Sequence, residues 1–175
     1  AAVTVLPVVV AIVSYYYFPP EARMNYGTLI PPRPLPGAPL PRQDEGAVAL
    51  SELRGRWVML TADASICNDR CRRKLYVMRQ VRAAQGVEGM GRIERIWLLT
   101  GEGYPSPELL AGYPGMRIAS AAPDLICSLP GDPDPADHIF LIDPLGNLML
   151  RFPADPDPGR MIEDLKRLLK VSRIG

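Results

Sequence analysis

The chain has 175 residues and a formal net charge of +1, from 20 Lys and Arg against 19 Asp and Glu. This length suits one ordinary domain, and the balanced charge excludes a global basic field that would attract nucleic acid. One histidine and three cysteines exclude a Cys₄ zinc site, a multi-histidine metal centre and a disulfide-dense scaffold. The 20 prolines exceed twice the usual ~5% and are expected in loops and linkers.

Residues 1–18 have the composition of a membrane anchor. The first charged residue is Glu21, and the apolar run ends in Tyr15, Tyr16, Tyr17 and Phe18. An uncharged run of about 18 residues reaches the lower limit for a spanning helix, and the aromatic end resembles an interfacial belt. A signal peptide would end in small residues instead. The sequence therefore predicts an uncleaved transmembrane helix over residues 1–18, with a buried helix or a signal peptide as the alternatives.

Residues 19–43 are predicted to be a Pro-rich tether. Six prolines lie between Pro31 and Pro41, and such a run favours an extended, semi-rigid polyproline II spacer. The tether would hold the remaining residues, 44–175, away from the membrane as one soluble domain.

Residues 44–175 alternate between strand-like and helix-like segments. Short apolar runs predict strands over residues 57–62, 93–99 and 116–119. Between them the pattern predicts a helix from about Asn68 to Gln85, stopped by Gly86, and a short helical turn over 107–111. Residues 120–137 are Pro-rich and predicted to be irregular.

The last third of the chain predicts a hairpin and a helix. Two apolar runs, 139–142 and 148–152, flank the turn sequence Asp-Pro-Leu-Gly-Asn. Asp157 and Pro158 then suit the N-cap and first position of a helix with one apolar face. The order strand, helix, strand, helix, hairpin, helix predicts an α/β protein with a thioredoxin-like fold, in which helices flank a mixed central sheet.

Cys67 and Cys71 carry the main functional signal. They follow the first predicted core strand, and residues four apart on a helix lie on one face, one turn apart. Cys71 should lean toward the core and Cys67 toward the helix start. The thiols are then close enough to form a disulfide or to bind one soft metal ion together, since thiolates select Cu(I) or Zn(II).

The sequence around the cysteine pair is basic. The stretch holds Arg70, Arg72, Arg73, Lys74, Arg79 and Arg82. Together with the positive end of the helix dipole, these charges favour thiolate and predict a lowered pKa for Cys67. The charge run alone also fits a solvated helix face.

The other candidate residues are His138 and Cys127. His138 is the only histidine, and so the only candidate for an imidazole ligand beside the thiolates; a structural role is the alternative. Cys127 has apolar neighbours and no partner at a suitable spacing, which predicts a small buried hydrophobic residue rather than a resolving thiol.

These features resemble the Sco-type proteins, membrane-anchored thioredoxin-like copper chaperones of cytochrome c oxidase assembly. The matching features are the anchor, the tether, Cys-x-x-x-Cys, and Asp137-His138 before an apolar run that ends in Ile-Asp-Pro-x-Gly, residues 142–146. The resemblance covers about residues 45–170. Arg72 stands where the family has proline. His138 lies closer to the following strand than the family histidine, and an odd shift along an extended segment turns a side chain to the other face.

The resemblance implies copper, as Cu(I) or Cu(II), held by Cys67, Cys71 and His138. It implies delivery of copper or electrons to the oxidase subunit that carries the binuclear copper centre, or a role at another respiratory membrane complex. It also implies a single-pass inner-membrane protein whose domain faces the periplasm or intermembrane space, where thiol–disulfide chemistry has an oxidising environment.

Two other functions stay open. In a periplasmic thiol–disulfide oxidoreductase, Cys67 would attack and Cys71 would resolve. Three intervening residues, and the lack of a proline directly before the Ile139 strand, argue against that class. The third possibility is a non-catalytic accessory or assembly subunit whose basic helix docks on an acidic partner. A metallochaperone or assembly factor fits the sequence better than a catalytic oxidoreductase.

Overall fold

The structure is a computed structural model, which describes residues 25–35, 39–41, 47–131 and 134–172, together with residues 6, 7, 9, 10 and 13. Within these ranges no helix has both the length and the apolar character needed to cross a membrane. The predicted anchor over residues 1–18 lies almost wholly outside the described residues, and it stays a prediction.

A six-stranded sheet organises the domain, in the order β1-β8-β7-β4-β5-β6. Its strands are β1 (Thr28–Pro34), β4 (Trp57–Asp63), β5 (Ile93–Leu99), β6 (Met116–Ser120), β7 (Ile139–Ile142) and β8 (Asn147–Arg151). Strands β4, β5 and β6 are parallel, while β7 is antiparallel to both β4 and β8. The predicted mixed sheet is therefore confirmed. A separate two-stranded sheet pairs β2 (Pro39–Pro41) with β3 (Ala47–Ala49).

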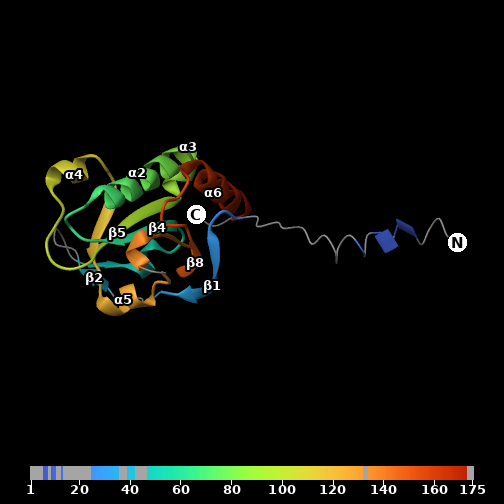
Figure 1. Cartoon of the computed structure of the whole chain (residues 1–175). Helices are drawn as coiled ribbons and strands as arrows, with labels where there is room; N and C mark the ends of the chain where they lie inside the picture. The colour runs from blue at the N-terminus through green and yellow to red at the C-terminus, as the bar shows by residue number, and fades with distance from the viewer. Residues whose placement is uncertain are drawn as a thin grey trace.

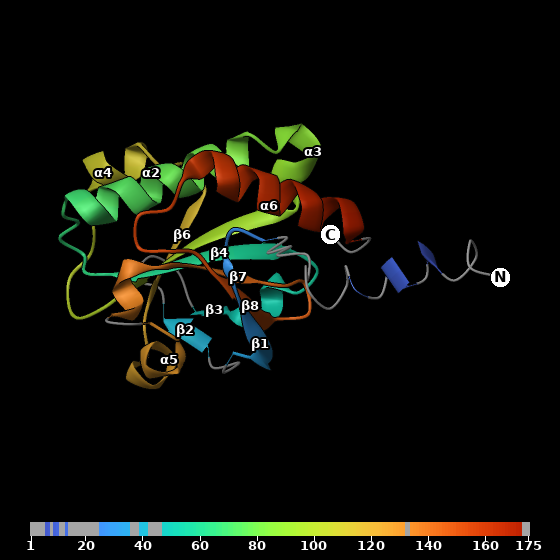
Figure 2. The ribbon, with the colours of Figure 1, turned by 45° about the vertical axis from the view of Figure 1, so that its right-hand side comes forward.

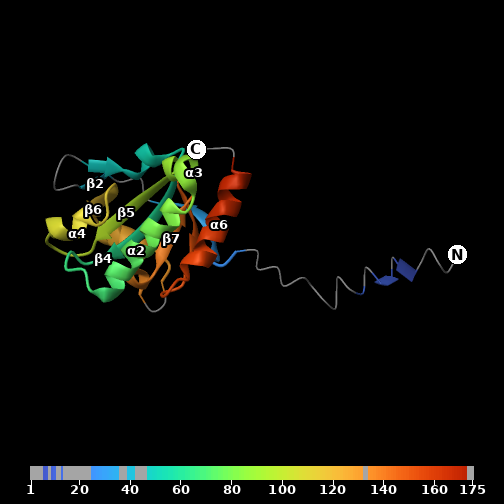
Figure 3. The ribbon, with the colours of Figure 1, turned by 90° about the horizontal axis from the view of Figure 1, so that it is seen from above.

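Helices cover both faces of the sheet. The helices are α2 (Asp69–Ala83), α3 (Gly86–Gly91), α4 (Pro107–Ala111), α5 (Pro123–Ser128) and α6 (Pro158–Val171), with 3₁₀ turns η1 (Leu50–Leu53) and η2 (Pro135–Asp137). Helices α2, α3, α4 and α6 lie over one face, and α5 and the β2–β3 pair lie over the other (Figures 1 and 2). Seen from above, α2 and α6 run beside one another (Figure 3). This arrangement confirms the thioredoxin-like α/β fold.

The two faces of β4 show how the core is divided. Val58 and Leu60 belong to the apolar cluster on the α5 side of the sheet. Trp57 and Met59 belong to the cluster on the α2 and α6 side. Because side chains alternate along a strand, an uninterrupted apolar run is what a strand buried on both sides requires.

Local signals in the sequence place the element ends. The long predicted helix ends at Ala83, shortly before Gly86, which lies at φ +74° and is the first residue of α3. In the β7–β8 hairpin, the Asp143 carboxylate accepts hydrogen bonds from the backbone N–H groups of Leu145 and Asn147, at 2.9 and 2.8 Å. Asp157 caps α6 by accepting from Arg160 N at 3.0 Å. These three features confirm the predicted helix stop, hairpin and N-cap.

Two Pro-rich segments differ from expectation. Part of the predicted tether, residues 28–34, forms β1 and pairs with β8 at the edge of the main sheet. An edge strand tolerates proline, and the register shifts between Leu29 and Arg33, where Pro31 and Pro32 lie. Residues 120–137, predicted as irregular, contain α5 and η2, since proline is favourable in the first turn of a helix.

Candidate redox and metal site

The cysteine pair lies where β4 leads into α2. The Asp63 carbonyl, at the end of β4, accepts hydrogen bonds from Thr100 N at 2.9 Å and from Trp97 Nε1 at 3.3 Å. After a short loop, Asn68 is the N-cap of α2 and accepts from Cys71 N at 2.9 Å. This cap places Cys67 just before the helix and Cys71 in its first turn.

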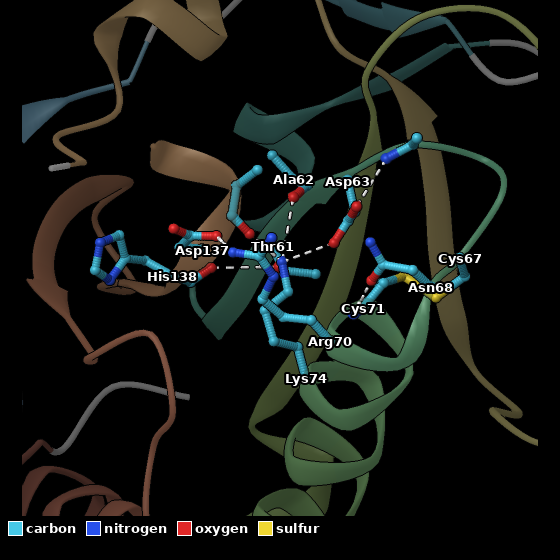
Figure 4. Close-up of polar contacts among 12 residues, drawn as sticks. Thr61, Ala62, Asp63, Cys67, Asn68, Arg70, Cys71, Lys74, Asp137 and His138 are labelled. Carbon is cyan, nitrogen blue, oxygen red and sulfur yellow. Dashed lines mark hydrogen bonds and ion pairs between the residues drawn. A yellow bond between two sulfur atoms is a disulfide. The ribbon is translucent and has the colours of Figure 1, made fainter. Parts of the chain in front are cut away.

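Cys67 and Cys71 form a disulfide, with their Cα atoms 5.2 Å apart (Figure 4). The separation is within the range that a disulfide requires, and the predicted closeness of the two thiols is confirmed. Cys67 is 8% exposed and Cys71 is 1% exposed. Both pack in an apolar cluster with Leu75, Trp97, Leu99 and Ile118. Cys71 is thus the more deeply buried cysteine, which agrees with its predicted position toward the core.

Several charges near the disulfide are paired. Arg70 forms an ion pair with Asp137, and Arg73 pairs with Asp155 at 2.7 Å. Arg72 instead donates from Nε to the Cys67 carbonyl at 3.3 Å. The guanidinium closest to the motif is thus tied to the backbone of Cys67. The lowered pKa expected for the Cys67 thiol stays a prediction for the reduced protein.

Lys74 is a functional candidate that the sequence analysis missed. Its side chain is 2% exposed, unlike a residue on a solvated helix face, and its Nζ lies 2.9 Å from the Asp63 carboxylate. Its Nζ also donates to the carbonyls of Ala62, at 3.4 Å, and Ala136. Lys74 therefore joins α2 to the end of β4 and to η2 directly beneath the cysteine motif.

The sequence held a signal for this burial. Positions 71, 74, 75 and 78 follow the i, i+3, i+4, i+7 spacing of one helix face. Its other three residues, Cys71, Leu75 and Met78, suit a core-facing side. Lys74 lies on that same face, so its burial could have been predicted from spacing. Its partner Asp63 could not, because the pairing depends on how β4 and α2 pack.

His138 lies apart from the cysteines. Its ring is buried, and Nδ1 lies 2.8 Å from the Phe152 carbonyl. Nε2 has no hydrogen-bond partner among the described residues. Figure 4 shows the ring on the far side of Asp137, directed away from the disulfide. Its own carbonyl accepts from Thr61 Oγ1 at 3.3 Å.

The structure therefore brings together two of the three predicted ligands. Within the described ranges, no group of three or more His, Cys, Asp or Glu side chains is arranged to hold a metal ion. In chemical terms, the reduced pair offers two soft sulfur donors, which suit Cu(I). His138 as the third ligand stays a prediction.

The prediction of a buried Cys127 was wrong. The sequence predicted a small buried residue, but Cys127 is a free, exposed cysteine on α5. The helix turns Leu125 toward the core, while Ile126 is partly buried. With only six residues, α5 has room for a narrow apolar face, and Cys127 lies outside it.

Comparisons with known proteins agree with this fold. The family model for a "transmembrane-like, thioredoxin-like, C-terminal domain" matches residues 57–172. The matched range includes β4 and α2, between which the cysteine pair lies. The chain belongs to this transmembrane-like, thioredoxin-like family. No curated protein sequence matches the chain.

Solved Sco structures share the fold. Apo Sco1 from Thermus thermophilus aligns with a TM-score of 0.65 and 20% identity, over 82% of this chain and 96% of that one. Yeast Sco1 with copper bound aligns with a TM-score of 0.66 and 15% identity, over 80% and 96%. A thiol:disulfide interchange protein from Chlorobium tepidum aligns with a TM-score of 0.59 and 21% identity, over 80% and 98%. The resemblance to Sco-type proteins seen in the sequence thus extends to the fold.

Proposed function

We propose that this chain is a Sco-like copper-binding and thiol-redox protein that assists assembly of the copper centre of cytochrome c oxidase. The observation that carries the proposal is the Cys67–Cys71 disulfide at the start of α2. The fold shared with copper-bound Sco structures adds support. The disulfide form has no free thiolate on these residues, so copper binding requires its reduction by two electrons.

In the proposed cycle, reduction of the disulfide gives two thiolates. The Cα atoms of Cys67 and Cys71 are already close enough for both sulfurs to bind one Cu(I). The amino end of α2 stabilises negative charge on Cys71. Arg72, hydrogen-bonded to the Cys67 carbonyl, adds positive charge beside the other sulfur. Both effects favour the anionic dithiolate that copper requires.

His138 would take part only after a local rearrangement. Its Nδ1 contact with the Phe152 carbonyl must break before the ring turns toward the cysteines. Cu(I) binds well to two sulfurs, whereas Cu(II) favours nitrogen and oxygen ligands. His138→Ala is therefore expected to retain Cu(I) and to lose Cu(II) binding and its visible spectrum. Loss of Cu(I) binding as well would make the imidazole a ligand in both states.

A competition titration tests the copper site. The reduced chain is mixed with Cu(I) and a chromogenic chelator, and compared with Cys67→Ser/Cys71→Ser and with Cys127→Ser as the matched thiol control. The proposal expects one Cu(I) per chain in the wild type and in Cys127→Ser, and none in the double variant. Equal copper retention by the double variant would remove these cysteines from the site.

A thiol–disulfide oxidoreductase is the second candidate. The disulfide itself and the similarity to the Chlorobium tepidum protein favour it. The two functions are separated by the titration above: a chain that binds no Cu(I) yet exchanges disulfides with a reduced protein substrate is an oxidoreductase.

Location and partner are part of the proposal. We expect an inner-membrane protein whose domain faces the periplasm or intermembrane space, and whose partner is the oxidase subunit with the binuclear copper centre or another respiratory complex. The uncharged run over residues 1–18 supports this. Resistance to carbonate extraction, and loss of the oxidase copper centre in cells that lack this chain, are the expected results. Extraction by carbonate would argue against the anchor.

A further inference from the structure

A pocket of about 320 Å³ opens between α2 and α4, and its lining includes Arg72, the residue that follows Cys71. Its lining residues are Arg72, Arg79, Ser106, Glu108, Leu109, Gly112 and Tyr113. Two contacts connect its lining residues to the cysteine motif. Arg72 donates to the Cys67 carbonyl, and Leu109 and Tyr113 also pack against the apolar cluster that contains both cysteines. This volume is at the lower end of the range for small-molecule sites.

The pocket wall is positively charged. Arg79 donates to the Gly112 carbonyl at 2.8 Å and lies over the Tyr76 ring, 5.8 Å from its centroid. Arg72 makes a backbone contact. In the part of the chain that the structure describes, neither guanidinium forms an ion pair. Glu108 is the acid in the lining, so two fixed positive charges face one negative charge.

A third, buried arginine lies behind this wall. Arg95 is 2% exposed and donates from Nη2 to the Pro114 carbonyl at 2.6 Å. Its Nε and Nη1 atoms have no hydrogen-bond partner among the described residues. Arg79 and Arg95 thus donate to carbonyls only two residues apart, at Gly112 and Pro114.

The surroundings of Arg95 are short of negative charge. Burial lowers the pKa of Arg95 to about 10, and repulsion from Arg82 and Arg79 adds to this effect against the opposing attraction of Glu94. An anion bound near Arg79 would relieve this repulsion, because opposite charges attract strongly where water is partly excluded.

From the pocket, its charge and its position, we infer that the pocket binds the carboxylate of a small anionic thiol that exchanges with the Cys67–Cys71 disulfide. This inference rests on the redox part of the proposed function. Arg72 and Arg79 hold the carboxylate. The Ser106 hydroxyl, whose oxygen accepts from Leu109 N at 3.3 Å, donates a further hydrogen bond to it. The thiol end of the ligand then lies toward Cys67, the more exposed of the two cysteines.

The exchange balances with two molecules of thiol. The first thiolate attacks Sγ of Cys67, the bond to Cys71 breaks, and the Cys71 sulfur leaves with the electron pair and is protonated. A second thiolate attacks the ligand sulfur of the mixed disulfide and releases Cys67 as thiolate. Two thiols are oxidised to one small disulfide, and the protein disulfide is reduced to two thiols.

The test compares an anionic with a neutral thiol. The oxidised full chain is reduced by 3-mercaptopropionate or by 2-mercaptoethanol, and free cysteines are trapped by alkylation and counted by mass. The ratio of the two rates cancels differences in unfolding and in the protein's general reactivity. In Arg79→Gln this ratio should fall about two- to fivefold relative to wild type, as expected for loss of one partly screened charge contact. Arg79→Lys should keep most of the ratio.

Arg73→Gln is the matched control. It removes the same charge from the same helix, but Arg73 pairs with Asp155 and does not line this pocket. The ratio should be unchanged in Arg73→Gln. An unchanged ratio in Arg79→Gln would overturn the inference, because Arg79 would then not contact the carboxylate. An equal fall in both variants would overturn it too, because the effect would then come from the overall charge of the helix.

The copper titration separates this inference from the proposed function. Suppose that Arg79→Gln leaves the ratio of the two reduction rates unaltered while the reduced wild type still binds one Cu(I). The anionic-thiol site is then refuted, and the proposed function stands. A disulfide that dithiothreitol does not reduce in the native chain overturns both the exchange and the redox role.

Discussion

The buried ion pair beneath the cysteine motif gives a sharp test of how the site is built. Asp63 accepts from Lys74 at 2.9 Å, and the Lys74 side chain is 2% exposed. Asp63→Asn keeps the shape of the side chain but leaves the ammonium buried with two carbonyl contacts. Removing one partner of a buried pair typically costs about 3–5 kcal/mol, so we expect a loss of about 3 kcal/mol in the free energy of unfolding.

Removing the other partner of the pair, Lys74, should lower the free energy of unfolding by less. In Lys74→Met, the remaining carboxylate is 16% exposed and still accepts from Ala64 N at 3.0 Å. We expect a loss of about 1–2 kcal/mol. The double variant, Asp63→Asn with Lys74→Met, should recover at least about 2 kcal/mol of the loss seen in Asp63→Asn, because no charge is left unpaired.

Urea unfolding without reductant measures these values while the disulfide stays intact. With an m value of about 2 kcal/mol/M, the midpoint for Asp63→Asn should fall by about 1.5 M. The reasoning is refuted if Asp63→Asn loses less than about 1 kcal/mol, or if the double variant shows the sum of the two single losses.

Three further outcomes follow from the described contacts. Reducing the disulfide should lower the free energy of unfolding by about 2 kcal/mol, the value for a short loop, since the cysteines are four apart in sequence; urea melts with and without dithiothreitol measure it, and no change would show that the bridge adds no stability. Native oxidised protein should take up one iodoacetamide, at the exposed Cys127; mass spectrometry counts the adducts, and an unmodified chain contradicts its exposure. Gly146→Ala should cost about 1 kcal/mol or more, because Gly146 lies at φ +92° in the β7–β8 turn; thermal melts measure it, and an unchanged Tm contradicts the turn.

The fold was largely predictable because its signals are local. The strand before Cys67, the hairpin around Gly146 and the cap at Asp157 each rest on a few adjacent residues. The edge strand β1 was not predictable in this way. Its prolines favour an extended chain whether or not it pairs, and pairing with β8 depends on residues more than a hundred positions away.

The candidate site was predictable in part. The spacing of Cys67 and Cys71 gave their closeness, but the position of His138 depends on which face its short segment presents. Lys74 lies on the buried helix face, but its partner Asp63 comes from β4, so their pairing depends on tertiary packing. The pocket at Arg79 arises from α2 and α4, which are apart in sequence, so only their packing reveals it.

X-ray absorption on the reduced, copper-loaded chain tests the central claim most directly, that Cys67 and Cys71 together bind copper. The account predicts a Cu(I) edge with a first shell dominated by two sulfur scatterers, and its loss in Cys67→Ser/Cys71→Ser. A first shell of nitrogen or oxygen alone, or a sulfur shell that persists in the double variant, would contradict it.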